Sequence, residues 1–414
     1  MKQTLLLLTG IVLATFSDTA NACTSAVISG KVTPDGRPLL WKNRDTSDLL
    51  NCVRYMKGEK YGYVAVTGYA EDPRSIWTGT NEAGFAIMNT LSYNLTEEEG
   101  EGSSKRNGAV MKRALEICAT VAEFRHYLDT LSRPMNVRTN YGVIDAQGNG
   151  FYFEVNSTEY REYDVNDPDV APHGFIVRSN YSFSGKLNEG AGYVRYQEAL
   201  EKLFTASATG KVTPQWLFST LSRSFRNPLL GIDLKDGRFN KPQSTGWFVE
   251  QDFIARRSSS CAVVIQGVRP DEHASFTTMW TVIGYPPVTP AVPVWASGAE
   301  KKLPRLLTVE KGTRHCPLCD AADTLRRNVY SYRRGMNTEN YFNWELLFNR
   351  NGNGYMQQAE ELETRMFDAL YGRIERWRKR KSLPAGEVHK LYDECDAFIE
   401  KNGRYLQELQ ANPD

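Results

Sequence analysis

The order of two hydrophobic periods along the chain is the feature that most constrains its fold. Groups of strand-like segments, in which apolar and polar residues alternate, are interrupted by groups with helical spacing. Grouped strands and helices favour a layered α+β arrangement over a regular βαβ alternation. The expected elements are short strands between 24 and 92, helices within 109–131, strands between 140 and 178, helices at 193–204 and 214–224, and strands at 259–266 and 277–285.

Composition excludes several classes of function. The chain has 414 residues, with 50 Lys and Arg against 49 Asp and Glu, so nothing in its charge indicates nucleic acid or an anionic membrane as a partner. An apolar fraction of 41% is typical of an ordered globular protein. The length allows one large domain with an appendage.

The first 22 residues have the pattern of a secretory signal peptide. Lys2 precedes an apolar stretch from Leu5 to Phe16, and Ala20-Asn21-Ala22 has the small residues that signal peptidase requires. We therefore expect an exported protein, periplasmic or secreted. No later run of about 18 apolar residues follows, so we expect no transmembrane span in the mature chain.

Cleavage after Ala22 makes Cys23 the first residue of the mature chain. Its thiol then shares a residue with an α-amine, whose ordinary pKa of about 7.7–8.0 suits a general base. Two other interpretations stay open: a lipid-anchored cysteine on a non-catalytic surface binding protein, and a structural thiol. Against the anchor, no aliphatic residue stands three places upstream, and the chain continues directly into the strand-like Ala26-Val27-Ile28.

A second cysteine pattern, His315-Cys316-Pro317-Leu318-Cys319, invites a metal or redox interpretation. A zinc site needs a further pair of ligands with similar spacing, and the sequence has none. A local disulfide or two free thiols fits better. We expect no metal and no cofactor.

The composition changes after Tyr285. Pro286, Pro287, Pro290 and Pro293 predict a stiff, extended connection. Beyond it, two apolar stripes with helical spacing, at 355–378 and 387–409, predict a helical hairpin. This hairpin is expected to pack on the main domain or on a second subunit, in which case the protein is a homo-oligomer.

Four short motifs follow one another along the chain. They are Cys23-Thr24, Lys42-Asn43-Arg44-Asp45, the Asn-x-x-Gly turn Asn81-Glu82-Ala83-Gly84 leading to Asn89, and Arg178-Ser179-Asn180-Tyr181. In their order and spacing they resemble the cysteine N-terminal-nucleophile hydrolases of the choloylglycine hydrolase, penicillin V acylase and penicillin acyltransferase group. That resemblance implies a four-layer αββα sandwich over residues 23–290, followed by a linker and C-terminal helical extension over 291–414.

The resemblance also implies roles for four residues. Cys23 attacks an amide carbonyl, Asp45 holds the α-amine, and Asn180 and Asn89 donate N–H groups to the oxyanion. The substrate is a small-molecule N-acyl amide: a bile-acid conjugate, a fatty-acid amide, an N-acyl amino acid or a penicillin V-like amide. The acyl group passes through a Cys23 thioester to water or to another amine. From the residues alone, Asp45 also fits a turn residue paired with Arg44, and Asn180 a strand-end cap.

The chain departs from the family pattern at its cations. Lys42 stands where the family usually has Arg, and Arg44 occupies the variable place. Either cation is a candidate neighbour of the nucleophile, and the two differ in hydrogen-bond geometry. A later family arginine corresponds to Arg256 or Arg257.

Overall fold

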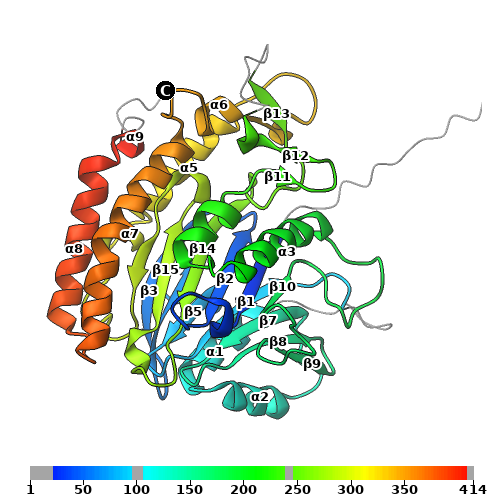
Figure 1. Cartoon of the computed structure of the whole chain (residues 1–414), viewed down its shortest axis with the longest axis vertical. Helices are drawn as coiled ribbons and strands as arrows, with labels where there is room; N and C mark the ends of the chain where they lie inside the picture. Colours follow the sequence, from blue (N-terminus) through cyan, green and yellow to red (C-terminus); the bar gives the residue numbers. More distant parts are fainter. Residues whose placement is uncertain (1–21, 96–105, 238–245, 408–414) are drawn as a thin grey trace, which may run out of the picture.

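Two antiparallel β-sheets form the centre of the protein (Figure 1). The computed structural model describes residues 22–95, 106–237 and 246–407. Apart from Ala22, the predicted signal peptide lies outside the described residues. None of the described helices is long and apolar enough to cross a bilayer.

The first sheet, sheet A, carries the strand that begins at Cys23. All of its neighbouring strands run antiparallel, and its strands come from three distant parts of the sequence. In spatial order they are β10 (Phe175–Arg178), β1 (Cys23–Ile28), β2 (Leu39–Asp45), β14 (Ser259–Gln266), β15 (Thr278–Ile283) and β16 (Val292–Val294).

The second sheet, sheet B, is a meander in which each strand pairs with the next along the chain. It contacts sheet A closely because two of its positions lack a side chain: a Cβ at Gly142 or Gly150 would lie 3.1 Å from the Val27 side chain of β1. Its strands are β3 (Asn51–Lys57), β4 (Gly62–Gly68), β5 (Thr78–Asn81), β6 (Ala86–Leu91), β7 (Thr139–Ile144), β8 (Gly150–Val155) and β9 (Tyr160–Asp164).

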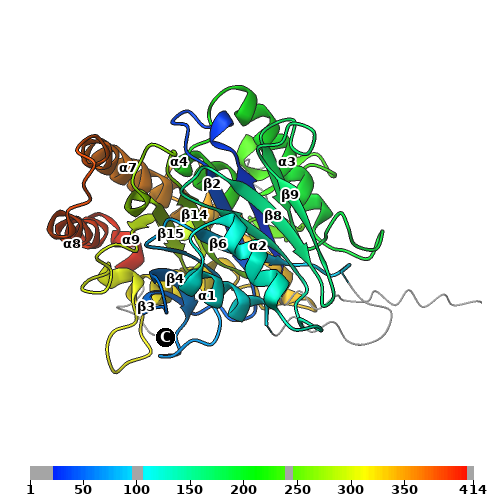
Figure 2. The same ribbon diagram turned by 90° about the horizontal axis from the view of Figure 1, so that it is seen from below.

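Helices cover the outer face of each sheet. On sheet B, α1 (Asn107–Ile117) and α2 (Val121–Thr130) bury an apolar cluster around Phe124. On sheet A lie α3 (Tyr193–Ala208), α4 (Pro214–Trp216) and the π-helical turn 217–222 that follows α4. Figure 2 shows the two pairs of helices on opposite sides of the sheets. The expected α+β sandwich of four αββα layers is confirmed.

The remaining elements lie along the left side and toward the top of Figure 1. Two further sheets have only two strands each. These elements are β11 (Arg226–Asn227), β12 (Ile232–Asp233), β13 (Trp247–Val249), β17 (Tyr341–Asn343), α5 (Pro317–Val329), α6 (Trp344–Leu347), α7 (Tyr355–Lys379), α8 (Ala385–Asn402) and α9 (Arg404–Gln407).

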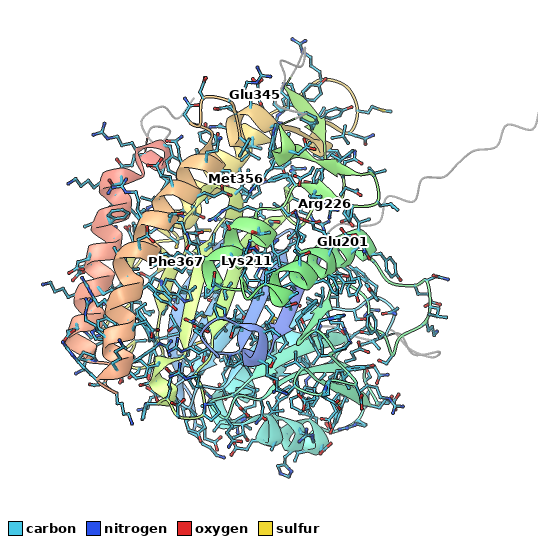
Figure 3. All side chains as sticks on the ribbon, in the orientation of Figure 1. Glu201, Lys211, Arg226, Glu345, Met356 and Phe367 are labelled. Carbon is cyan, nitrogen blue, oxygen red and sulfur yellow. The ribbon has the colours of Figure 1, made fainter. Side chains whose placement is uncertain are left out.

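The predicted helical hairpin, α7 and α8, packs on the body of the same chain. Phe367 of α7, marked in Figure 3, stacks on Trp280 of β15 with 4.3 Å between ring centroids. The Tyr392 hydroxyl of α8 accepts a hydrogen bond from the backbone nitrogen of Trp295 at 3.1 Å. Of the two expected packing partners, the main domain is therefore the one observed. Oligomerisation through these helices stays a prediction.

The proline-rich segment after Tyr285 is buried, although we expected an extended connection there. Pro286 and Pro287 lie in a 3-10 helix, and Pro293 lies in β16, the edge strand of sheet A. An edge strand tolerates proline because one of its sides needs no ladder hydrogen bond. The predicted domain boundary at 290 remains a prediction, with β16 just beyond it.

Candidate active site

A cavity of about 180 Å³ lies between β1, β2, β6 and the start of α1. Its wall brings together most of the residues that the sequence singled out. Leu91, the segment 75–77 and the first two residues of α1 also line it. The predicted site residues in the wall are Cys23, Lys42, Arg44, Asp45 and Asn89.

The pleat of β2 sorts its polar residues onto two faces. Cys23 lies opposite Arg44 in the β1–β2 register. Because side chains alternate along a strand, Lys42 and Arg44 share the face toward sheet B and the cavity. Asn43 and Asp45 share the other face, where Asn43 donates to the backbone oxygen of Ile254 at 3.0 Å.

The backbone nitrogen of Cys23 is held by Asn180, which lies two residues beyond the end of β10. This nitrogen donates to Asn180 Oδ1 at 3.1 Å, and Arg195 Nη2 donates to the same oxygen at 2.8 Å. Two donors at one position require the amide oxygen there, so the orientation of the Asn180 amide is determined. Its Nδ2 donates to the backbone oxygen of Leu91 at 2.8 Å.

Arg195 is a site residue that the sequence analysis missed. It is buried on α3, and its Nη1 donates to the backbone oxygen of Cys23 at 2.8 Å and to Thr24 Oγ1 at 2.9 Å. Burial lowers its pKa and Arg256 lowers it further, against the opposing charge of Asp252. The sequence did contain a signal for this residue. Arg195 shares the buried face of α3 with Ala199 and Leu203, and an arginine on an apolar stripe is rarely buried unless it has a polar or charged partner.

Asp45 pairs with Arg256, so it is not the turn residue paired with Arg44 that one interpretation allowed. Arg256 Nε lies 3.1 Å from Asp45 Oδ2, and Ser259 Oγ donates to Asp45 Oδ1 at 2.6 Å. Burial raises the pKa of Asp45, while Arg256 and Arg195 oppose that rise. Of the two candidate arginines, Arg256 is the one at the site, since Arg257 is exposed.

Lys42 and Arg44 are both buried in the cavity wall. Lys42 Nζ donates to the backbone oxygen of Trp77 at 2.7 Å and to Asn89 Oδ1 at 3.0 Å. The Arg44 guanidinium lies 4.0 Å from the centre of the Trp77 ring. Burial lowers the pKa of both cations, and the neighbouring Cys23 acts in the opposite direction.

Asn89 lies on β6, directly across the cavity from β2. Its Oδ1 accepts from Lys42, and its Nδ2 donates to Thr139 Oγ1 at 3.0 Å. The Nδ2 groups of Asn89 and Asn180 thus each already donate to a protein oxygen. The predicted oxyanion roles of these two residues stay predictions.

The second cysteine pattern lies at the start of α5, away from the residues that line this cavity. Cys316 and Cys319 are buried free thiols at the start of α5, as one of the expectations for this pattern had it. Among the described residues, no group of three His, Cys, Asp or Glu side chains is arranged to hold a metal ion.

Comparison of the whole fold with solved structures gives likenesses of low score. The chain resembles a variant of the conjugated bile acid hydrolase from Clostridium perfringens (TM-score 0.41, 12% identity, 66% of this chain and 93% of that one). It also resembles the Caenorhabditis elegans orthologue of N-acylethanolamine-hydrolyzing acid amidase (TM-score 0.38, 17% identity, 63% and 99%). The penicillin V acylase from Agrobacterium tumefaciens is similar at a TM-score of 0.36 and 14% identity (66% and 85%). With all three TM-scores below 0.5, no functional conclusion follows from them.

Sequence comparison gives a more specific result. No curated protein matches the chain. A family model, acyl-coenzyme A:6-aminopenicillanic acid acyl-transferase, matches residues 32–198. The matched segment contains Lys42, Arg44, Asp45, Asn89 and Asn180 and begins after Cys23. Over residues 32–198 the chain is therefore similar to the acyl-coenzyme A:6-aminopenicillanic acid acyl-transferase family, which confirms the resemblance to the penicillin acyltransferase group of N-terminal-nucleophile hydrolases.

Proposed function

We propose that this protein is an exported hydrolase of N-acyl amides that uses Cys23, freed as the mature N-terminus, as its nucleophile. The family supports a reaction on N-acyl amides, either hydrolysis or acyl transfer. The observation that carries the proposal is the hydrogen bond from the Cys23 nitrogen to Asn180 beside the cavity that the Cys23 residue lines. Cleavage after Ala22 turns this nitrogen into an α-amine at a position where a polar side chain already holds it.

The proposed reaction uses the amine and the thiol of one residue. The α-amine takes the thiol proton while Sγ attacks the amide carbonyl. The carbon–nitrogen bond then breaks, and the leaving amine takes that proton. Water attacks the resulting thioester and gives a proton to the α-amine. The carbon–sulfur bond breaks, the thiol recovers its proton, and the carboxylic acid leaves.

The neighbouring residues have distinct proposed tasks. Asn180 and Arg195 hold the nitrogen and the backbone oxygen of Cys23, so both fix the nucleophile in place. Asp45, paired with Arg256, anchors the end of β2 behind them. Lys42 places a positive charge in the cavity wall, where it would stabilise the negative charge of a thiolate or an oxyanion.

Replacement of the nucleophile tests the proposal. Cys23→Ala is expected to lower the hydrolysis rate by at least about 10³-fold on a panel of a glycine-conjugated bile acid, an N-acylethanolamine and penicillin V. Cys118→Ala is the matched control, because this thiol is also buried but does not line the cavity. It lies in the apolar cluster between sheet B and the helices that cover it. Circular dichroism verifies that both variants fold. Activity retained by Cys23→Ala would contradict the mechanism.

Mass spectrometry of the exported protein tests the other half of the proposal. The mature chain is expected to begin at Cys23 with a free amine and to be recovered outside the cytoplasm. A diacylated or triacylated Cys23 would instead identify a lipid-anchored protein without the proposed base. An acid-quenched reaction is expected to carry the acyl group on the peptide that begins with Cys23.

Acyl transfer is the second candidate function, because the matching family is described as an acyl-transferase. Both reactions share the thioester and differ only in whether water or an amine attacks it. Addition of an acceptor amine to the assay distinguishes them. A new amide formed faster than the free acid would establish transfer.

A further inference from the structure

The two cations in the cavity wall lack charged partners. Among the described residues, every hydrogen bond from Lys42 and Arg44 goes to a neutral acceptor, and neither residue forms an ion pair. Lys42 bonds a backbone oxygen and the amide of Asn89. Arg44 Nη1 bonds the backbone oxygen of Asp48 at 3.1 Å, Asn51 Oδ1 at 3.1 Å and Ser260 Oγ at 2.8 Å.

The nearby acidic groups leave this charge uncompensated. The Asp45 carboxylate is paired with Arg256 on the opposite face of β2. Asp48 is exposed and offers Arg44 only its backbone oxygen. Cys261 lies opposite Arg44 on β14, and burial raises the pKa of its thiol to about 11, so it is neutral at pH 7. A Cys23 thiolate offsets one of the two cations, and the second remains.

Arg44 presents a free edge. All three of its hydrogen bonds leave from Nη1, and its guanidinium is supported by the face of Trp77. Its Nε and Nη2 donate to none of the described residues. That pair of N–H groups is the edge with which arginine binds a carboxylate through two parallel hydrogen bonds.

We propose that Arg44 binds an anionic group, a carboxylate, that the substrate carries close to its scissile amide. The inference rests on the proposed function and specifies its substrate class. A cavity of about 180 Å³ is smaller than the roughly 300–1,000 Å³ of a drug-sized site. It therefore accommodates a small charged head, such as the amino acid of an N-acyl amino acid, while a longer acyl chain extends beyond it.

Matched substrate pairs measure the preference directly. N-acylglycine and N-acylglycinamide differ only by the charge on the amine side of the scissile bond. A monoamide of a dicarboxylic acid and its methyl ester differ by the charge on the acyl side. In at least one pair, kcat/KM is expected to be roughly 10- to 100-fold higher for the charged member, the range of a charge-assisted hydrogen bond. The pair that shows the preference identifies the side of the carboxylate.

Arg44→Gln is expected to bring that ratio close to one. Arg113→Gln is the control, because Arg113 lies on the solvent side of α1 and pairs with Glu59 and Glu116. The control is expected to keep the wild-type ratio. A wild-type ratio near one in both pairs, or an unchanged ratio in Arg44→Gln, overturns the inference while leaving the proposed hydrolysis intact.

Binding separates the two proposals if turnover fails. In Cys23→Ala, calorimetric titration compares N-acylglycine with N-acylglycinamide and repeats the comparison with Arg44→Gln added. Tighter binding of the charged ligand that disappears with Arg44→Gln supports the inference. Equal binding of the two ligands, or no binding of either, overturns it. Absence of turnover in the wild type contradicts only the proposed function.

Discussion

Arg44 and Arg223 are both buried arginines, yet their surroundings are opposite. Arg223 forms two 2.8 Å contacts with the Glu363 carboxylate and donates to the backbone oxygens of Pro286 and Thr289. Burial alone would lower the pKa of Arg223, but the charge and hydrogen bonds of Glu363, with the charges of Glu360 and Tyr405, raise it above the ordinary value. Burial also acts most strongly on Arg44, and there the charges around it do not offset burial, so its pKa is lowered.

The difference indicates what each arginine does. A buried charge is tolerated when the fold itself supplies the counter-charge, and Glu363 of α7 does this while it joins the C-terminal helices to the body. At the cavity, our proposals assign the counter-charge to the Cys23 nucleophile and to the carboxylate of the substrate. The buried pair of Arg223 and Glu363 is structural, whereas Lys42 and Arg44, which form no ion pair with any described residue, line the cavity of the candidate active site.

Removal of the partner in the structural pair is expected to have the largest effect. Glu363→Ala leaves Arg223 buried without a counter-charge, which costs about 3–5 kcal/mol of unfolding free energy. Urea denaturation measures the loss. Glu360→Ala, which breaks the more exposed pair with Lys235, is the control and is expected to cost less than about 1 kcal/mol. A loss as small as the control's would remove the contrast between the two arginines.

Asp45→Asn tests the charged residues of the candidate active site, as Glu363→Ala tests the structural pair. Loss of this carboxylate frees Arg256 and loosens the end of β2, and a misplaced nucleophile typically costs about 10²-fold in rate. Burial raises the pKa of Asp45, so the wild-type kcat/KM is expected to fall as the pH drops through a value above that of an ordinary aspartate.

The pH profile of the variant distinguishes this role from simple destabilisation. Asp45→Asn is expected to lose the step of the acid limb that Asp45 contributes and to keep the step from protonation of the α-amine, whereas Asp48→Asn, an exposed control on the same segment, keeps both. An acid limb that persists unchanged in Asp45→Asn would show that another group titrates there.

Glu272 is an intermediate case, in which one carboxylate serves two buried arginines. Arg37 and Arg378 both contact it. Burial raises its pKa, but the bonds from Arg37 and from the Arg269 nitrogen, with the charge of Arg378, lower it to about 2. Because the folded pKa is depressed, the stabilisation is present above about pH 4.5 and is lost as the pH falls toward 2.

Glu272→Gln is expected to lower stability at pH 7 by roughly 1–3 kcal/mol and to flatten its dependence on pH between 4.5 and 2. Urea midpoints at several pH values measure both effects. Glu375→Gln is the control, because Glu375 joins the same cluster with a more exposed side chain. Parallel pH curves for the wild type and Glu272→Gln would contradict the assignment.

Much of the fold could be predicted because its signals are local. The apolar stripes that predict the C-terminal hairpin correspond to α7 and α8, and alternation predicted most strands of the two sheets. The two-stranded sheets were not predicted. β11 and β12 have two residues each, and β13 pairs with β17 from a distant part of the chain, so no local period marks them.

The candidate site divides in the same way. The motifs predicted Cys23, Lys42, Arg44, Asp45 and Asn89, and the structure gathers all five in one cavity wall. Arg195 was missed, because its contact with the Cys23 oxygen joins residues 172 positions apart. The choice between Arg256 and Arg257 also needed the structure, since adjacent residues at the end of a loop carry no periodic signal.

By itself, the sequence determined which side chains of β2 share a face, because strand geometry alternates them whatever the strand packs against. It likewise determined that Cys23 follows a predicted cleavage point and begins a strand. Only the tertiary structure decided that Asp45 has an ionic partner in Arg256 while Lys42 and Arg44 have none among the described residues, because ion pairing depends on which distant segments the fold brings within about 4 Å.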